Sequence, residues 1–146
     1  MGKRGVTLVE LVVVMVIIAL AAVLVIPNIG SWIPIYRLRS GVREVVSTMR
    51  TAQMKAVSQN TEFRVSFDDT ANTYVLERNS GGSYQREGVV QQLPKGVQIS
   101  AITLPGKNAE FNPNSSSSGG SITLKNQKGV ERRIVVFAAT GRIRVE

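Results

Sequence analysis

Residues 11–26 form an unbroken apolar run near the start of the chain. The apolar pattern reaches back to Val6, and only Thr7 and Glu10 interrupt it. As a helix with a rise of about 1.5 Å per residue, this segment would be about 24–32 Å long, close to the thickness of bilayer hydrocarbon. The pattern predicts a helix that can span a membrane.

Basic residues flank this segment on its N-terminal side only. Lys3 and Arg4 precede it, and no further basic residue follows before Arg37. The positive-inside rule therefore places Met1 in the cytoplasm and the rest of the chain outside. The alternatives are a plain signal anchor, a buried helix of a soluble core, and a secretory signal cleaved after residues 19–21, which would leave an apolar stub.

From Ile35 onward the apolar residues follow the spacing of an amphipathic helix. They step by three and four residues, which places them on one face: Ile35, Leu38, Val42, Val45, Met49, Ala52 and Ala56. Arg39, Arg43 and Arg50 lie off this stripe. We therefore expect a stem helix with one face on a globular head and the other in solvent.

Gly30, Pro34 and Gly41 argue against a straight helical rod. A proline inside a helix removes a backbone donor and clashes with the preceding turn. We therefore expect a kink or a break near residues 28–34.

After Gln59 the pattern changes to period two, which is typical of strands. Phe63, Val65 and Phe67 alternate with polar residues, and residues 68–72 form a turn before the next strand. Further candidate strands are separated by Gly, Asn, Pro or Ser: 84–93, 97–104, 121–125, 132–137 and 142–145. A helix followed by strands predicts an α+β fold, with a long N-terminal helix packed on an antiparallel β-sheet head.

Residues 112–120 contain four consecutive serines and two glycines. A segment of this composition can bury little surface. We expect it to be a mobile loop between strands.

The composition limits the chemistry that is available. The chain has 146 residues, a formal charge of +8, and neither cysteine nor histidine. It can form one modest head, but it lacks the residues of disulfide frameworks, thiol catalysis, common zinc sites and Ser-His-Asp triads. Asp68 and Asp69 are adjacent, which is not the geometry of a paired-carboxylate site. We therefore expect no enzyme, no metal site and no cofactor.

Glu10 lies one turn inside the apolar segment, where a carboxylate is costly unless it is paired or neutralised. Residues 5–10, Gly-Val-Thr-Leu-Val-Glu, resemble the N-terminal signal of type IV pilins and pseudopilins. The resemblance implies that a prepilin peptidase cuts between Gly5 and Val6, that Val6 becomes N-methylated, and that Glu10 pairs with a neighbouring subunit's terminal amine. Val6 departs from the family, which usually has phenylalanine there. The resemblance also assigns Pro27 as a helix-distorting residue.

Four segments of the C-terminal half resemble, in their order, the GspH/FimT pilin family. They are Phe-Asn-Pro at 111–113, Gly-Gly-Ser-Ile-Thr-Leu at 119–124, Arg-Ile-Val-Val at 133–136 and Thr-Gly-Arg-Ile-Arg at 140–144. The resemblance implies a bacterial inner-membrane protein with one membrane pass and a periplasmic head, which then enters a pilus or pseudopilus filament. Its partners would be other pilin or pseudopilin subunits, the prepilin peptidase and the inner membrane.

The C-terminal tail is basic, because residues 125–146 carry many more cations than carboxylates. In an extended strand Arg142 and Arg144 project from the same face, a spacing that suits successive phosphates. Gly-Arg-Ile-Arg at 141–144 also resembles a motif associated with DNA binding in FimT-like minor pilins. The alternative is a solvated edge whose arginines prevent aggregation. The candidate DNA-binding residues are Arg142, Arg144, Arg132, Arg133 and Lys128.

These patterns predict a leader at residues 1–5, a hydrophobic helix at 6–27, an amphipathic stem at 28–60 and a β-rich head at 61–146. The predicted function is that of a minor pilin or pseudopilin that primes or caps a type IV pilus-like filament, with DNA binding for uptake as a further hypothesis. The alternative is a type II secretion pseudopilin that contacts exported protein cargo.

Overall fold

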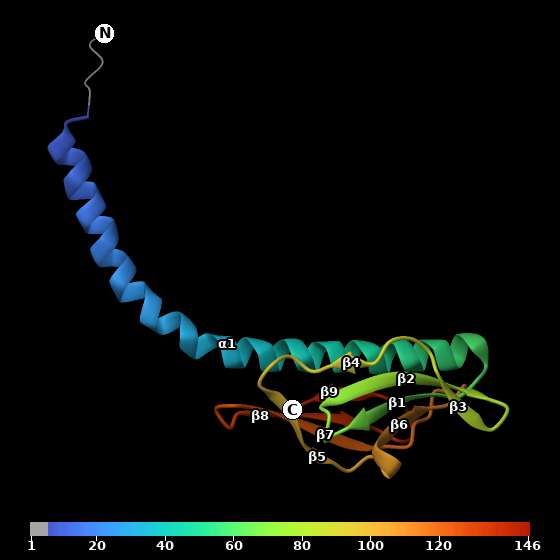
Figure 1. The fold of residues 1–146 in the computed structure, drawn as a ribbon. Helices are drawn as coiled ribbons and strands as arrows, with labels where there is room; N and C mark the ends of the chain where they lie inside the picture. The colour runs from blue at the N-terminus through green and yellow to red at the C-terminus, as the bar shows by residue number, and fades with distance from the viewer. Residues whose placement is uncertain (1–5) are drawn as a thin grey trace, which may run out of the picture. The chain divides into compact units, whose positions relative to one another are not determined.

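The computed structural model describes residues 6–146, except for the side chains at 24–29 and 31. Gly5 of the predicted cleavage site lies outside the described residues. The chain divides into two compact units, Met1–Ile33 and Pro34–Glu146. Helix α1 (Leu8–Gln59) contributes to both units, and the strands belong to the second (Figure 1). The finer predicted boundaries between leader, apolar helix, stem and head stay predictions.

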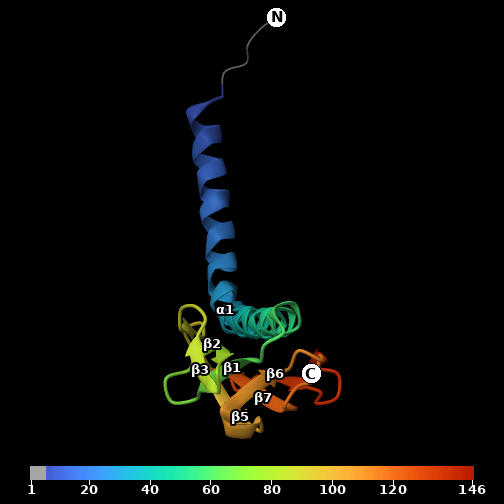
Figure 2. The same ribbon diagram turned by 90° about the vertical axis from the view of Figure 1, so that its right-hand side faces the viewer.

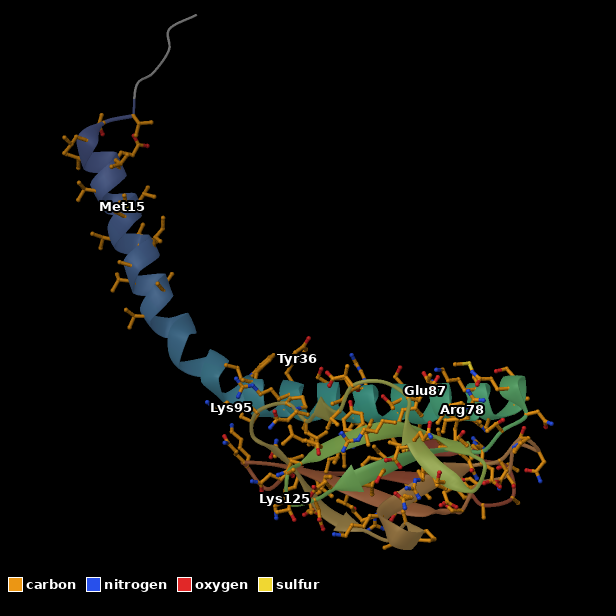
Figure 3. All side chains as sticks on the ribbon, turned by 45° about the vertical axis from the view of Figure 1, so that its right-hand side comes forward. Met15, Tyr36, Arg78, Glu87, Lys95 and Lys125 are labelled. Atoms are coloured by element: carbon orange, nitrogen blue, oxygen red, sulfur yellow. The ribbon has the colours of Figure 1, made fainter. Side chains whose placement is uncertain are left out.

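The described part of the first unit is dominated by apolar side chains. Those of the large apolar residues from Val6 to Val23 are 49–79 % exposed. They point outward from the helix, as the side chains around Met15 show (Figure 3). Among the described residues, no helix combines the length and the apolarity that crossing a membrane requires.

Helix α1 is one element of 52 residues that continues through Pro27 and Pro34. The predicted break is therefore not an end of the helix. A change of helix direction near residues 28–34 stays a prediction, as does the distorting role of Pro27, whose side chain lies outside the described ones.

The stem part of α1 buries the predicted stripe from Leu38 to Ala56, whereas Ile35 at its start is 37 % exposed. Val45, Met49 and Ala52 have 0 % exposure, and Leu38 has 1 %. Arg39, Arg43 and Arg50 are exposed, as predicted. The amphipathic character of the stem is thus confirmed.

Two antiparallel sheets lie against the stem (Figure 2). Sheet A has the order β3-β2-β1-β6, and β4 pairs with β2 along the same edge as β3. Sheet B has the order β5-β7-β8-β9. The sheet A strands are β1 (Phe63–Asp68), β2 (Thr73–Ser80), β3 (Ser83–Arg86), β4 (Gln91–Gln92) and β6 (Asn108–Phe111). The sheet B strands are β5 (Val97–Ile102), β7 (Gly120–Asn126), β8 (Glu131–Val136) and β9 (Ile143–Val145), and a short 3-10 turn η1 (Pro105–Lys107) precedes β6.

The core joins the stem to both sheets, which confirms the α+β prediction. Besides the stem stripe, its largest fully buried side chains are Phe63, Tyr74 and Phe111 from sheet A and Ile122, Leu124 and Ile134 from sheet B. A polar contact also links the sheets, since the Ile99 N–H donates to Asn72 Oδ1 at 2.9 Å. On the stem, Lys55 Nζ lies 2.9 Å from Glu87 Oε1 of the loop after β3.

Residues 84–93 do not form the single strand that was expected from the sequence. β3 ends at Arg86, and β4 comprises only Gln91–Gln92. Gly88 lies between them at φ 127°, a conformation that interrupts a strand and that glycine adopts readily. β6 is not predicted at all, because its four residues are too short a run to establish period two.

The serine-rich segment 112–120 is more firmly attached than its composition predicts. Ser117 is only 7 % exposed, and its N–H donates to the Ala138 carbonyl at 2.8 Å. The Ser118 N–H donates to the Glu110 carbonyl at 3.1 Å. The expectation that this segment buries little is therefore wrong at Ser117, where backbone hydrogen bonds offset the polar composition.

Candidate assembly and binding sites

The N-terminal turn of α1 carries two of the predicted assembly residues. Leu8 is the first helical residue, so Thr7 is the N-cap and Glu10 is the third helical residue. The Glu10 N–H donates to Thr7 Oγ1 at 3.2 Å, and the Leu11 N–H donates to the Thr7 carbonyl at 3.2 Å. Thr-x-x-Glu is the sequence of a capping box, so the same residues that resemble a processing signal also start the helix.

This cap leaves the charged group of Glu10 accessible. Val6 is 71 % exposed, and Glu10 is exposed as well. A carboxylate in the first turn is stabilised by the positive end of the helix dipole, here without any ion pair to Glu10 among the described residues. The turn therefore presents a carboxylate that a cation from another molecule can reach.

The predicted basic residues divide between the two faces of sheet B. Strand register places Arg133 beside Glu146, and Arg144 beside Val135. Because side chains alternate along a strand, Arg133, Arg142 and Arg144 share the face opposite the buried Ile134. The structure thus brings three of the five candidate DNA-binding residues together.

Arg132 and Lys128 are placed differently. Arg132 pairs with Leu124, a buried residue, so it extends from the end of the inner face. Lys128 lies in the turn between β7 and β8, where its N–H donates to Asn126 Oδ1 at 2.9 Å. These two cations border the three-arginine face but do not lie on it.

Carboxylates near the basic face are few and solvent-exposed. Arg144 Nε lies 3.9 Å from Glu146 Oε1, and Lys125 Nζ lies 3.5 Å from Glu131 Oε1. Among the described residues no ion pair involves Arg133 or Arg142. Exposed pairs of this kind contribute little stability, so these arginines remain available to an anionic partner.

A glycine sets the start of β9. Gly141 has φ 59°, and its N–H donates to the Phe137 carbonyl at 2.8 Å. A β-carbon there would lie 2.6 Å from the Ser115 carbonyl oxygen and 2.8 Å from Gln53 Nε2. Only glycine fits this turn between the serine-rich segment and the stem, and the turn fixes where Arg142 and Arg144 emerge.

A polar cluster on sheet A is satisfied internally. Arg64 Nε lies 2.7 Å from Glu77 Oε2, and its guanidinium lies 3.7 Å from the centre of the Tyr84 ring. The Tyr84 hydroxyl donates to Glu62 Oε2 at 3.3 Å. Burial raises the pKa of Tyr84, and the charges of Glu110 and Glu62 add to this effect. The cluster joins β1, β2 and β3 through contacts among its own members.

The sequence matches the models of two known families. The family model of the type II transport protein GspH matches residues 41–141, and that of the prokaryotic N-terminal methylation motif matches residues 1–26. Together with the helix and the two-sheet head, these matches define a pilin-like protein. Since the first match covers more than half of the chain, the chain belongs to the GspH family. This confirms the resemblance found in the sequence.

Two solved structures have a similar fold. The minor pseudopilin EpsH from the type 2 secretion system of Vibrio cholerae matches with a TM-score of 0.65 and 11 % identity, over 75 % of this chain and 96 % of EpsH. The type IV minor pilin FimU of Pseudomonas aeruginosa matches with a TM-score of 0.60 and 15 % identity, over 75 % of this chain and 92 % of FimU. Among curated proteins, no sequence matches the chain. The family and these neighbours are filament subunits rather than enzymes.

Proposed function

We propose that this chain is a minor subunit of a type IV pilus-like filament, held in the bacterial inner membrane by its N-terminal helix before assembly and acting without catalysis. The observation that carries the proposal is the segment from Val6 to Val23, whose large apolar side chains are 49–79 % exposed. Such a surface is stable only when lipid or other apolar helices cover it. The N-terminal methylation motif over residues 1–26 supports this role.

Processing of the N-terminus completes the proposal. A prepilin peptidase cleaves between Gly5 and Val6, and the new amine of Val6 is methylated. Glu10 of one subunit then accepts the terminal ammonium of a neighbour, since two buried opposite charges satisfy each other while they set the helix register. The accessible carboxylate in the capped first turn supports this pairing.

Mass spectrometry and filament isolation test this function together. We expect the mature chain to lack residues 1–5 and to carry one added methyl group. We expect Glu10→Gln to be processed normally but to be absent from sheared filaments, while Glu44→Gln, a matched change on the exposed stem, is incorporated. A mature chain that keeps its leader would contradict the processing step, and incorporation of Glu10→Gln would contradict the pairing.

A role as a type II secretion pseudopilin that contacts exported cargo is the alternative. The similarity of the head to EpsH favours it, and the similarity to FimU favours a pilus. Deleting the gene separates them, because loss of secreted protein with intact surface pili indicates the secretion system. Loss of pili with intact secretion indicates the pilus.

DNA binding by the three-arginine face (Arg133, Arg142 and Arg144) is a second candidate function. It is favoured by three guanidiniums on one sheet face, of which, among the described residues, only Arg144 forms an ion pair, with its Nε 3.9 Å from Glu146 Oε1. Phosphates suit this arrangement because contact with them needs no base recognition.

Fluorescence anisotropy of labelled duplex DNA with the full chain in detergent micelles tests this function. We expect the log affinity to fall by about 0.9 per log unit of salt for each phosphate neutralised. Arg142→Ala with Arg144→Ala should remove most binding, whereas Arg78→Ala with Arg86→Ala on sheet A should not. Equal binding by both double variants would contradict this function.

A further inference from the structure

The stem and β9 border a groove of about 440 Å³. Val46 and Met54 of α1 and Val145 of β9 supply apolar surface, and Met54 and Val145 are 64 % and 44 % exposed. Arg43, Ser47 and Arg50 line the same groove from the exposed side of the helix. The groove therefore combines an apolar floor with a cationic wall.

One side of this groove is a sheet edge with unused backbone groups. β9 is the last strand of sheet B. Arg133 and Glu146 exchange two backbone hydrogen bonds, of 3.0 and 2.8 Å. Because hydrogen-bonding direction alternates along an antiparallel strand, the N–H and C=O groups of Ile143 and Val145 point away from β8. In the described part of the chain, no hydrogen bond involves these groups.

A free edge beside an apolar floor suits an added strand. An extended peptide can hydrogen-bond to Ile143 and Val145, and its alternate side chains then face the floor. β9 is only three residues long, so the backbone alone offers few bonds, and the groove has to supply the remaining affinity.

The charge of the wall selects the kind of peptide. Arg43 and Arg50 are exposed, and among the described residues neither forms an ion pair with a carboxylate. They are seven residues apart on the helix, or about 10 Å along its axis, so carboxylates on an extended strand can reach both. The chain itself carries a charge of +8, which disfavours a second copy in this groove.

We propose that the groove between α1 and β9 binds an extended segment of a different protein, which turns both apolar side chains and Asp or Glu side chains toward the groove from every second position. The segment adds a strand to the β9 edge, places its apolar side chains on Val46, Met54 and Val145, and pairs its carboxylates with Arg43 and Arg50. This surface is separate from the three-arginine face, since Val145 and Arg144 point to opposite faces of sheet B.

Labelled model peptides test the proposal with the full chain in detergent micelles. In the probe peptide every second residue is threonine, and the positions between the threonines are alternately valine and glutamate, so that both valine and glutamate face the groove. Its matched control has lysine in place of glutamate. We expect binding of the first only, measured by fluorescence anisotropy and by amide shifts of Ile143 and Val145 in NMR spectra. N-methylation of alternate peptide amides should weaken binding by about tenfold or more through lost edge hydrogen bonds.

Two variants of the protein separate the edge from the wall. Val145→Pro removes only an N–H that points to the free edge, so the β8–β9 pairing is kept and binding should be lost. Arg43→Glu with Arg50→Glu should abolish binding of the glutamate peptide, while Arg78→Glu with Arg86→Glu, an equal charge change on sheet A, should leave it unchanged. Urea unfolding checks that each variant is folded. If Val145→Pro does not fold, the N-methylated peptide still tests the role of the β9 edge.

Several results would overturn the proposal. Equal binding of the glutamate and lysine peptides would show that Arg43 and Arg50 do not select the peptide. Equal binding of the N-methylated and unmethylated glutamate peptides would show that the β9 edge does not hydrogen-bond to the peptide. If neither peptide binds but Arg43→Glu with Arg50→Glu weakens binding of duplex DNA, the groove belongs to a nucleic-acid surface instead.

Discussion

The two parts of α1 handle apolar surface in opposite ways. From Leu8 to Val23 the large apolar side chains are 49–79 % exposed, whereas the stem stripe from Leu38 to Ala56 is at most 9 % exposed. From Leu11 onward the first part is apolar on every side, and the second part is apolar on one face only. One helix thus carries an apolar segment with exposed side chains and a stem whose apolar stripe is buried against the head.

This difference shows how one helix can serve two environments. The stem stripe is satisfied by sheets A and B, so the second unit has a core of its own. In the proposed function, the N-terminal segment would gain its stability from lipid or from neighbouring helices that cover it. Substitutions in the stem should therefore change the stability of the head, whereas substitutions in the N-terminal segment should leave it unchanged.

The largest effect is expected from a charge in the stem stripe. Val45→Asp places a carboxylate without a partner at a position with 0 % exposure, and should lower the free energy of unfolding by about 3–5 kcal/mol. Urea unfolding of the full chain in detergent, followed by circular dichroism, measures the change. Val14→Asp, in the exposed segment, should leave the head transition unchanged. Equal destabilisation by both substitutions would show that the two parts are not energetically separate.

A smaller effect on the free energy of unfolding is expected from a substitution in the turn before β9. This substitution should affect the second unit alone. Gly141→Ala should cost about 2 kcal/mol, because a left-handed conformation is combined with close contacts to Ser115 and Gln53. Gly129→Ala is the control, since Gly129 has φ 79° but nothing within 4 Å of its β-carbon position. It should cost about 1 kcal/mol. Equal costs in thermal unfolding would show that the close contacts at Gly141 are unimportant.

A still smaller effect is expected at the start of the first unit. Thr7→Ala removes the side-chain acceptor of the Glu10 N–H and should cost about 1 kcal/mol of local helix stability. Amide hydrogen exchange of Glu10 in micelles should then be about fivefold faster. Thr7→Ser should restore protection, and head unfolding should be unaffected by either change. Unchanged exchange in Thr7→Ala would mean that the hydroxyl does not cap the helix.

Much of the fold was predictable because its signals are local. The stem stripe predicted burial from spacing alone, and the alternation at Phe63, Val65 and Phe67 predicted β1. Where the prediction failed, the decisive contacts were distant in sequence. Ser117 is buried because its N–H reaches the Ala138 carbonyl, and no composition rule contains that pairing.

The candidate sites were predictable to different degrees. The period of a strand already placed Arg142 and Arg144 on one face, but only strand register showed that Arg133, and not Arg132, shares that face. The Thr-x-x-Glu capping signal was present in the sequence and was missed, because Glu10 was considered only as a buried charge. The groove depends on which strand is last in sheet B, so no sequence pattern could have indicated it.

The contact between stem and sheet also predicts that alkaline pH lowers the free energy of unfolding, whereas neutral pH leaves it unchanged. Burial raises the pKa of Tyr74, the charge of Glu44 raises it further, and a hydrogen bond with Thr48 acts in the opposite direction. The folded state therefore keeps the phenolic proton at a pH where the unfolded state has lost it, so this contribution is fully present below about pH 10 and is lost as the pH rises above it. Tyr74→Phe should show a smaller loss of stability than the wild type between neutral and alkaline pH in urea unfolding. An identical decline in both would mean that other groups, such as Tyr84, account for the alkaline sensitivity.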